Sequence, residues 1–176
     1  MSDDYSGLFG AFPYAFRRSD SRLFRAYTAL GGLLAVALAV LFTFALVVTV
    51  ASTANLSGGT VTFVRSVFIL FGFLVVAPLV APVLFAARRH RREGSDPRYD
   101  AGLAVAGGVY LATLYLGAVA SMPARFEIDG RVTTRPDPGG PAAPLVEALY
   151  AVPEVVSWTI PLAGALLIFL VHRRLG

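Results

Sequence analysis

The chain has 176 residues, of which 56% are hydrophobic and only 15% charged, with a net charge of +4. Soluble domains carry about 25% charged residues, so this composition excludes an ordinary soluble domain. The chain has no cysteine and all of its basic residues are Arg, which excludes disulfides, thiolate chemistry, Cys-ligated metals and Schiff-base lysines.

Four long apolar runs lack Asp, Glu, Lys, Arg and His entirely; they are 26–64, 66–87, 101–124 and 155–171. About 20 apolar residues span the hydrocarbon core as a helix, and ionisable side chains are costly there. We therefore predict an all-α, polytopic membrane protein of a single domain, 1–176, with four transmembrane helices. The predicted spans are about 23–51, 61–87, 101–121 and 155–171.

The N-terminal segment, 1–22, carries an aromatic pattern. Phe9, Phe12 and Phe16 have the spacing of one helix face, and such a face followed by arginines suits the membrane interface. Pro13 weakens the helix because it removes a backbone donor. We expect a short interfacial helix before the first span.

The first two spans have recognisable ends and one interruption. Asp20 or Ser21 can cap the first helix by accepting from its free N–H groups. The polar, Gly-rich stretch 52–60 predicts a short turn. Pro78 and Pro82 lie inside the second span, so we expect a kink there, with neighbouring helices satisfying the freed carbonyls.

Two hydrophilic segments follow, at 88–100 and at about 122–152. The first is the most charged part of the chain. The second contains the Phe126–Thr133 stretch with a central Asp-Gly pair, which predicts a small β-hairpin. Residues 144–152 predict a short amphipathic surface helix.

The arginines predict the orientation of the chain. Segments 1–25 and 88–100 and the C-terminus carry eleven of the fifteen, and basic residues favour the cytoplasmic side. We expect a multi-pass protein of the cell membrane with both termini cytoplasmic and the hairpin extracellular. A glycosylation sequon at Asn55 would then lie outside; whether it is modified stays open.

The densest charge is the arginine cluster in 88–92. One interpretation is a topology determinant at the cytoplasmic boundary, and the other is contact with anionic lipid headgroups. The candidates for headgroup contact are Arg17, Arg18, Arg88, Arg89, Arg91 and Arg92. A nucleic-acid partner is not expected, because so short a segment beside the membrane contains no reading element.

Small residues at four-residue spacing let helix backbones approach closely. The candidates for helix packing are Gly31, Ala35, Ala104, Gly108, Ala112 and Gly117. Packing within the bundle is one use of these ridges, and formation of a homo-oligomer is the other.

No catalytic constellation is visible. The chain has no nucleotide-binding, zinc-protease or hydrolase motif. His90 and His172 both lie among arginines, which opposes metal binding. No ionisable residue lies in the middle of a span, and Glu154 at the edge of the fourth is the nearest case, which disfavours a proton-coupled carrier. We expect no catalytic residue, no cofactor and no metal.

Three stretches carry a family likeness: 12–25, 86–92 and 171–174. Together they resemble small uncharacterised membrane proteins of halophilic archaea. The resemblance implies a location in an archaeal cell membrane and supplies no catalytic residue.

We therefore expect an integral membrane protein of unassigned activity that is not an enzyme, structural or accessory to a membrane complex. Its partners would be the bilayer, anionic headgroups, and a membrane-protein partner or a second copy. A small oligomeric carrier or channel is the first alternative. A lipid-interacting or lipid-modifying enzyme is the second.

Overall fold

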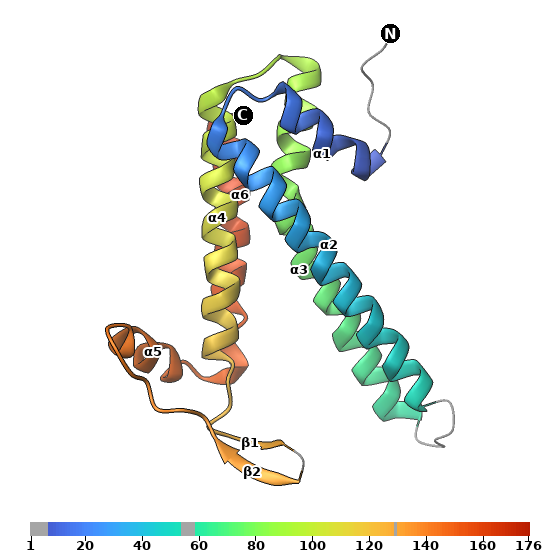
Figure 1. Ribbon diagram of the computed structural model, residues 1–176, viewed down its shortest axis with the longest axis vertical. Coiled ribbons are helices and arrows are strands. Elements are labelled where there is room, and N and C mark those ends of the chain that lie inside the picture. Colours follow the sequence, from blue (N-terminus) through green and yellow to red (C-terminus); the bar gives the residue numbers. More distant parts are fainter. Residues whose placement is uncertain (1–6, 54–58, 129) are drawn as a thin grey trace. The chain divides into compact units, whose positions relative to one another are not determined.

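The computed structural model describes residues 7–53, 59–128 and 130–176. In chain order the elements are α1 (Gly7–Arg18), α2 (Arg22–Thr53), α3 (Gly59–Arg92), α4 (Pro97–Ala120), β1 (Arg125–Ile128), β2 (Arg131–Thr134), α5 (Ala143–Tyr150), the 3-10 turn η1 (Glu154–Val156) and α6 (Thr159–Leu175) (Figure 1). The predicted turn at 52–60 and the Asn55 sequon centre on residues that lie outside the described ones.

Four segments are long and apolar enough to cross a membrane. They are Arg22–Thr49, Gly72–Arg92, Pro97–Ala120 and Glu154–Leu175. The prediction of an all-α fold with four long apolar helices and a small hairpin is therefore confirmed, and the chain is a multi-pass membrane protein.

The chain forms two compact units. Unit 1 comprises Met1–Gly108 and Ile168–Gly176, and unit 2 comprises Val109–Leu167. Helices α4 and α6 each contribute residues to both units.

In unit 1, α1 packs on α2 and α3 through a face of small residues. Ala11 and Ala15 are fully buried. The Phe12 ring packs closely against Gly32 of α2, where an added Cβ would be 3.0 Å from the ring. Phe16, expected on an interfacial aromatic face, is exposed. The helix continues through Pro13, which is exposed.

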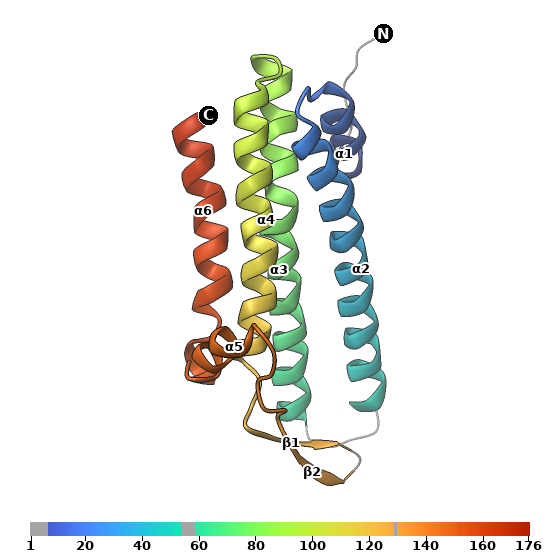
Figure 2. The ribbon, with the colours of Figure 1, turned by 60° about the vertical axis from the view of Figure 1, so that its left-hand side comes forward.

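Helices α2 and α3 run antiparallel, side by side (Figure 1, Figure 2). Phe42 and Phe73 meet with ring centroids 5.6 Å apart. A Cβ on Gly72 would come within 2.6 Å of the Phe42 ring, so this close approach requires glycine. The Tyr27 hydroxyl donates to the Leu79 carbonyl at 2.7 Å, in the stretch where Pro78 and Pro82 interrupt the backbone bonding of α3.

Helix α2 has a defined N-terminal cap, and helices α3 and α6 end later than the predicted spans. Ser21, rather than Asp20, caps α2: its Oγ accepts from the N–H of Phe24 at 3.2 Å. Helix α3 extends beyond the predicted end at residue 87 to Arg92, because the four basic residues of its last turn interact favourably with the negative end of the helix dipole. Helix α6 likewise ends in basic residues at Leu175, beyond the predicted 171.

Unit 2 contains the hairpin, α5 and the adjoining parts of α4 and α6. The strands pair antiparallel from Arg125 opposite Thr134 to Ile128 opposite Arg131, and Gly130 has the positive φ of 77° that the predicted turn requires. Helix α5 begins one residue before the predicted surface helix, 144–152, and ends two residues before its predicted end.

Close approach of α4 to α6 in unit 2 also depends on glycine. A Cβ on Gly164 would come within 3.1 Å of the Tyr110 Cα, and one on Gly117 within 2.9 Å of the Pro161 Cδ. Small residues at such contacts let two helix backbones meet.

Candidate functional site

Three side chains meet in the interior of unit 1: one from α3, one from α4 and one from the connection between α1 and α2. The Asp100 carboxylate accepts from the Ser19 hydroxyl at 2.5 Å. Its oxygens lie 2.9 Å and 3.0 Å from Nε2 of His90. Ser19 and Asp100 are fully buried and the His90 side chain is 1% exposed. We call Ser19, His90 and Asp100 the buried polar cluster.

Local structure positions each member of this cluster. Ser19 lies in the connection between α1 and α2, where its Oγ also accepts from the N–H of Ser21 at 3.2 Å and its carbonyl accepts from Arg25 Nε at 2.8 Å. His90 belongs to the last turn of α3, and Asp100 to the first turn of α4. A carboxylate in a first helical turn is favoured by the helix dipole.

The hydrogen bonds within the cluster are those of a structural link between helices and not those of a serine nucleophile with its base. A serine nucleophile needs a base within hydrogen-bond reach, but here Ser19 donates to the carboxylate, and the carboxylate separates it from His90. Nδ1 of His90 is buried without a hydrogen-bond partner among the described residues. The cluster therefore exposes no reactive atom, and its hydrogen bonds join α3, α4 and the connection before α2.

A second layer lies one residue away along both helices. The Tyr99 hydroxyl and Nδ1 of His172 are 2.6 Å apart. The His172 ring stacks on Phe85 at 4.1 Å between centroids, and the guanidinium of Arg89 lies 4.3 Å over the Tyr99 ring. These contacts tie the end of α6 to α3 and α4 within unit 1.

Arg89 supplies the positive charge of this layer, and neighbouring groups of unit 1 compensate that charge. Its Nη1 donates to the Leu175 carbonyl at 2.6 Å, which caps α6. Its other nitrogens lie 3.2 Å from the Glu93 carboxylate and 3.4 Å from that of Asp96.

Asp96 caps α4 by accepting from the N–H groups of Arg98 and Tyr99 at 2.9 and 3.3 Å. Hydrogen bonds from the Tyr99 and Arg98 N–H groups, followed by the charges of Arg89 and Arg98, hold the pKa of the Asp96 carboxyl below its ordinary value of 3.8.

The arginines proposed for headgroup contact separate into two groups. Arg89 is engaged within unit 1 as described above, and its side chain is only 20% exposed. The others are exposed: Arg17, Arg18, Arg88, Arg91 and Arg92. Headgroup contact therefore stays a prediction for these five, whereas Arg89 has a structural role.

The proposed packing residues also fall into two groups. Gly31, Ala35, Ala104 and Gly117 are buried, whereas Gly108 and Ala112 are exposed. At the Tyr27 contact on α4 the close approach is made by Gly107, since a Cβ there would come within 2.3 Å of the Tyr27 ring, and open space surrounds Gly108. A contact of Gly108 with a second copy stays a prediction.

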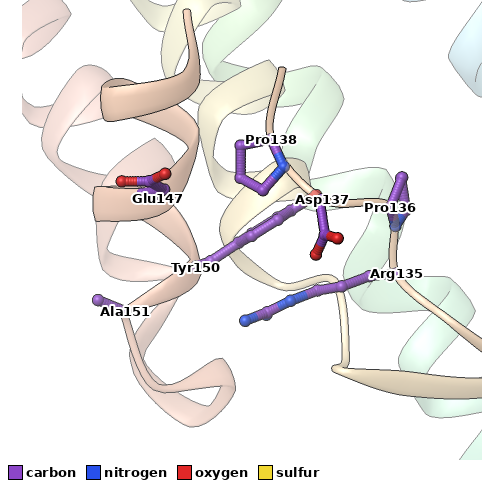
Figure 3. A pocket seen from close by; sticks show the side chains of 7 residues that line it. All are labelled: Arg135, Pro136, Asp137, Pro138, Glu147, Tyr150 and Ala151. Carbon is purple, nitrogen blue, oxygen red and sulfur yellow. The ribbon is translucent and has the colours of Figure 1, made fainter.

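Unit 2 has a surface pocket of about 380 Å³ between the stretch after β2 and α5 (Figure 3). The guanidinium of Arg135 lies 4.0 Å over the Tyr150 ring, and Pro138 lies on the opposite side of that ring. The carboxylates of Asp137 and Glu147 are exposed. The stacking fastens this stretch to α5, and the exposed charges of both signs form no reactive arrangement.

Metal ligands do not converge in the described part of the chain, which has no group of three or more His, Cys, Asp or Glu side chains suited to hold an ion. The two histidines lie among arginines, as the sequence indicated, but each has a defined partner: Asp100 for His90 and Tyr99 for His172.

The whole chain, residues 1–176, matches the family described as a domain of unknown function, DUF8056. The chain belongs to this family. No curated protein and no solved structure matches it. The name DUF8056 assigns no activity.

Sequence reasoning missed the buried polar cluster of this DUF8056 protein. The sequence places His90 in the charged segment 88–100, of which Asp100 is the last residue. One signal was available: Asp100 directly precedes the uncharged run 101–124, and an acid at the start of a buried helix needs a partner.

Proposed function

We propose that the protein is a structural or accessory component of a membrane complex and has no catalytic activity of its own. The observation that carries the proposal is the closed bonding of Asp100. Its carboxylate is buried and occupied by Ser19 and His90, so it is bound within the fold and not presented to a solute or substrate. Its role in the fold is to join helices.

The exposed apolar surface of α2 supports the same proposal. Leu33, Phe44 and Val48 are each about two-thirds exposed, at 67%, 66% and 65%. Lipid covers such a face in a monomer, and a partner subunit can cover it in a complex. An accessory protein needs an apolar face of this kind inside the bilayer.

The test is affinity purification of the tagged protein from its native membrane in mild detergent, with mass spectrometry of the bound proteins. We expect a stoichiometric membrane-protein partner. Recovery of the protein alone, together with solute flux when it is reconstituted into liposomes, would contradict the proposal and favour a small oligomeric carrier.

We also propose that both termini and the connection between α3 and α4 are cytoplasmic, in the membrane of a halophilic archaeon. The arginine distribution supports the orientation, and the resemblance noted above supports the source. In Ser95→Cys the thiol should be shielded from an impermeant reagent in intact cells, and in Thr134→Cys it should react. Both positions are exposed on the protein. The reverse labelling pattern would overturn the orientation.

A further inference from the structure

Arg88 and Arg92 differ from Arg89, which lies between them near the end of α3. Both are exposed and lie one helical turn apart at the end of α3. Among the described residues neither side chain has a hydrogen bond or ion pair, whereas Arg89 between them is neutralised by Glu93 and Asp96. Arg88 and Arg92 therefore both carry uncompensated positive charge.

The two arginines disfavour each other in the absence of an anion. Like charges four residues apart on a helix destabilise it. An anion placed between the two guanidinium groups would remove this repulsion and accept hydrogen bonds from both. Guanidinium groups match the oxygens of a phosphate group particularly well, because the fork of donors is planar and bidentate.

Arg88 and Arg92 also border two hollows of unit 1. One, of about 460 Å³, is lined by these two residues with Leu84 and Arg91. The other, of about 210 Å³, is lined by the same two arginines together with Phe85, Arg89, Glu93, His172 and Gly176. The carboxylate of Glu93 is paired with Arg89, at 3.2 Å from its Nε. Arg88 and Arg92 therefore remain as the cationic pair that an anion would contact.

The order of residues along α3 indicates where the phosphate comes from. Leu84, Arg88 and Arg92 follow one another at four-residue intervals and form a single stripe on the helix. The stripe is apolar within the candidate span Gly72–Arg92 and cationic at its end. A phospholipid has the same polarity, with an acyl chain beside Leu84 and a phosphate beside the arginines.

We infer that Arg88 and Arg92 form a binding site for a phosphate group, presented by an anionic phospholipid. The inference does not depend on the accessory role proposed above. Free phosphate shares the recognised chemistry, so the experiment includes an arm for it.

The test uses the full chain, purified in detergent and delipidated. Native mass spectrometry would follow binding of phosphatidylglycerol, with phosphatidylcholine as the zwitterionic comparison and inorganic phosphate as the soluble probe. The test variant is Arg88→Gln with Arg92→Gln. The matched control is Arg173→Gln with Arg174→Gln, which removes the same charge from two exposed residues at the end of α6.

We expect the Arg88/Arg92 variant to weaken phosphatidylglycerol binding about tenfold or more, and the Arg173/Arg174 control to change it less than about twofold. Binding of inorganic phosphate with the same sensitivity, and no binding of phosphatidylglycerol, would support a phosphate site but overturn its assignment to a phospholipid. Equal effects of the two double variants, or no effect of either, would overturn the inference. All four substituted side chains are exposed, and size-exclusion chromatography would verify that both variants remain folded.

Discussion

The Asp100 carboxylate lies 2.9 and 3.0 Å from Nε2 of His90 with both side chains withdrawn from solvent. His90 lies near the end of α3 and Asp100 near the start of α4, so the contact joins consecutive helices across a short connection. Burying such a pair costs desolvation energy, and it is retained only where additional hydrogen bonds satisfy it. Ser19 supplies that additional bond.

Removal of the Ser19 hydroxyl should loosen this arrangement. Ser19→Ala takes away a donor to the buried Asp100 carboxylate, and we expect it to lower the free energy of unfolding by about 1–3 kcal/mol. Ser95→Ala is the control, because Ser95 is exposed. Denaturant unfolding in detergent would measure both. Equal stability of the two variants would show that the Ser19 bond contributes nothing.

Two neighbouring glycines of α4 should respond in opposite ways to the same substitution. In Gly107→Ala the new methyl would lie within 2.3 Å of the Tyr27 ring, which is held by its bond to the Leu79 carbonyl. We expect a loss of about 1–3 kcal/mol from overpacking. In Gly108→Ala the methyl enters open space, so the better helix propensity should stabilise the protein by up to about 1 kcal/mol. Thermal unfolding of both variants checks this; equal shifts would contradict the packing.

The cap made by Asp96 predicts a dependence on pH. Its folded-state pKa lies below the ordinary value of 3.8, because the Tyr99 and Arg98 N–H groups and the Arg89 charge favour the carboxylate. The stabilisation is therefore fully present above that ordinary value and is lost as the pH falls through the lower folded-state pKa. Asp96→Ala should reduce the melting temperature at pH 7, and the difference from the wild type should shrink below pH 4. A difference that stays constant with pH would exclude this origin.

The four spans could be predicted because each is an uncharged run long enough to cross a bilayer, and the hairpin because Asp-Gly has a strong turn preference. The end of α3 could not. The basic residues 88–92 predict a charged connection, whereas in the structure they complete the last turns of α3, where the helix dipole favours them. The contact between His90 and Asp100 forms because α3 continues through His90. It therefore depends on where the helix ends.

Residue-level packing was also beyond sequence reasoning. The ridge containing Ala104 and Gly108 was recognised by its spacing, but the contact with Tyr27 is made by Gly107. Neighbouring positions on a helix differ by about 100° in direction, and the residues next to Gly107 at four-residue spacing are Leu103 and Leu111. The spacing of small residues therefore does not mark Gly107, and which row faces α2 depends on the rotation of α4.

The central claim is that the buried polar cluster holds helices together, and a double-mutant cycle of Asp100→Asn and His90→Gln tests it most directly. Unfolding free energies of the wild type, the two single variants and the double variant would be measured in one detergent. We predict that each single variant is destabilised and that the two residues are coupled by about 1–3 kcal/mol. A coupling energy near zero, with the two losses simply additive, would contradict the claim.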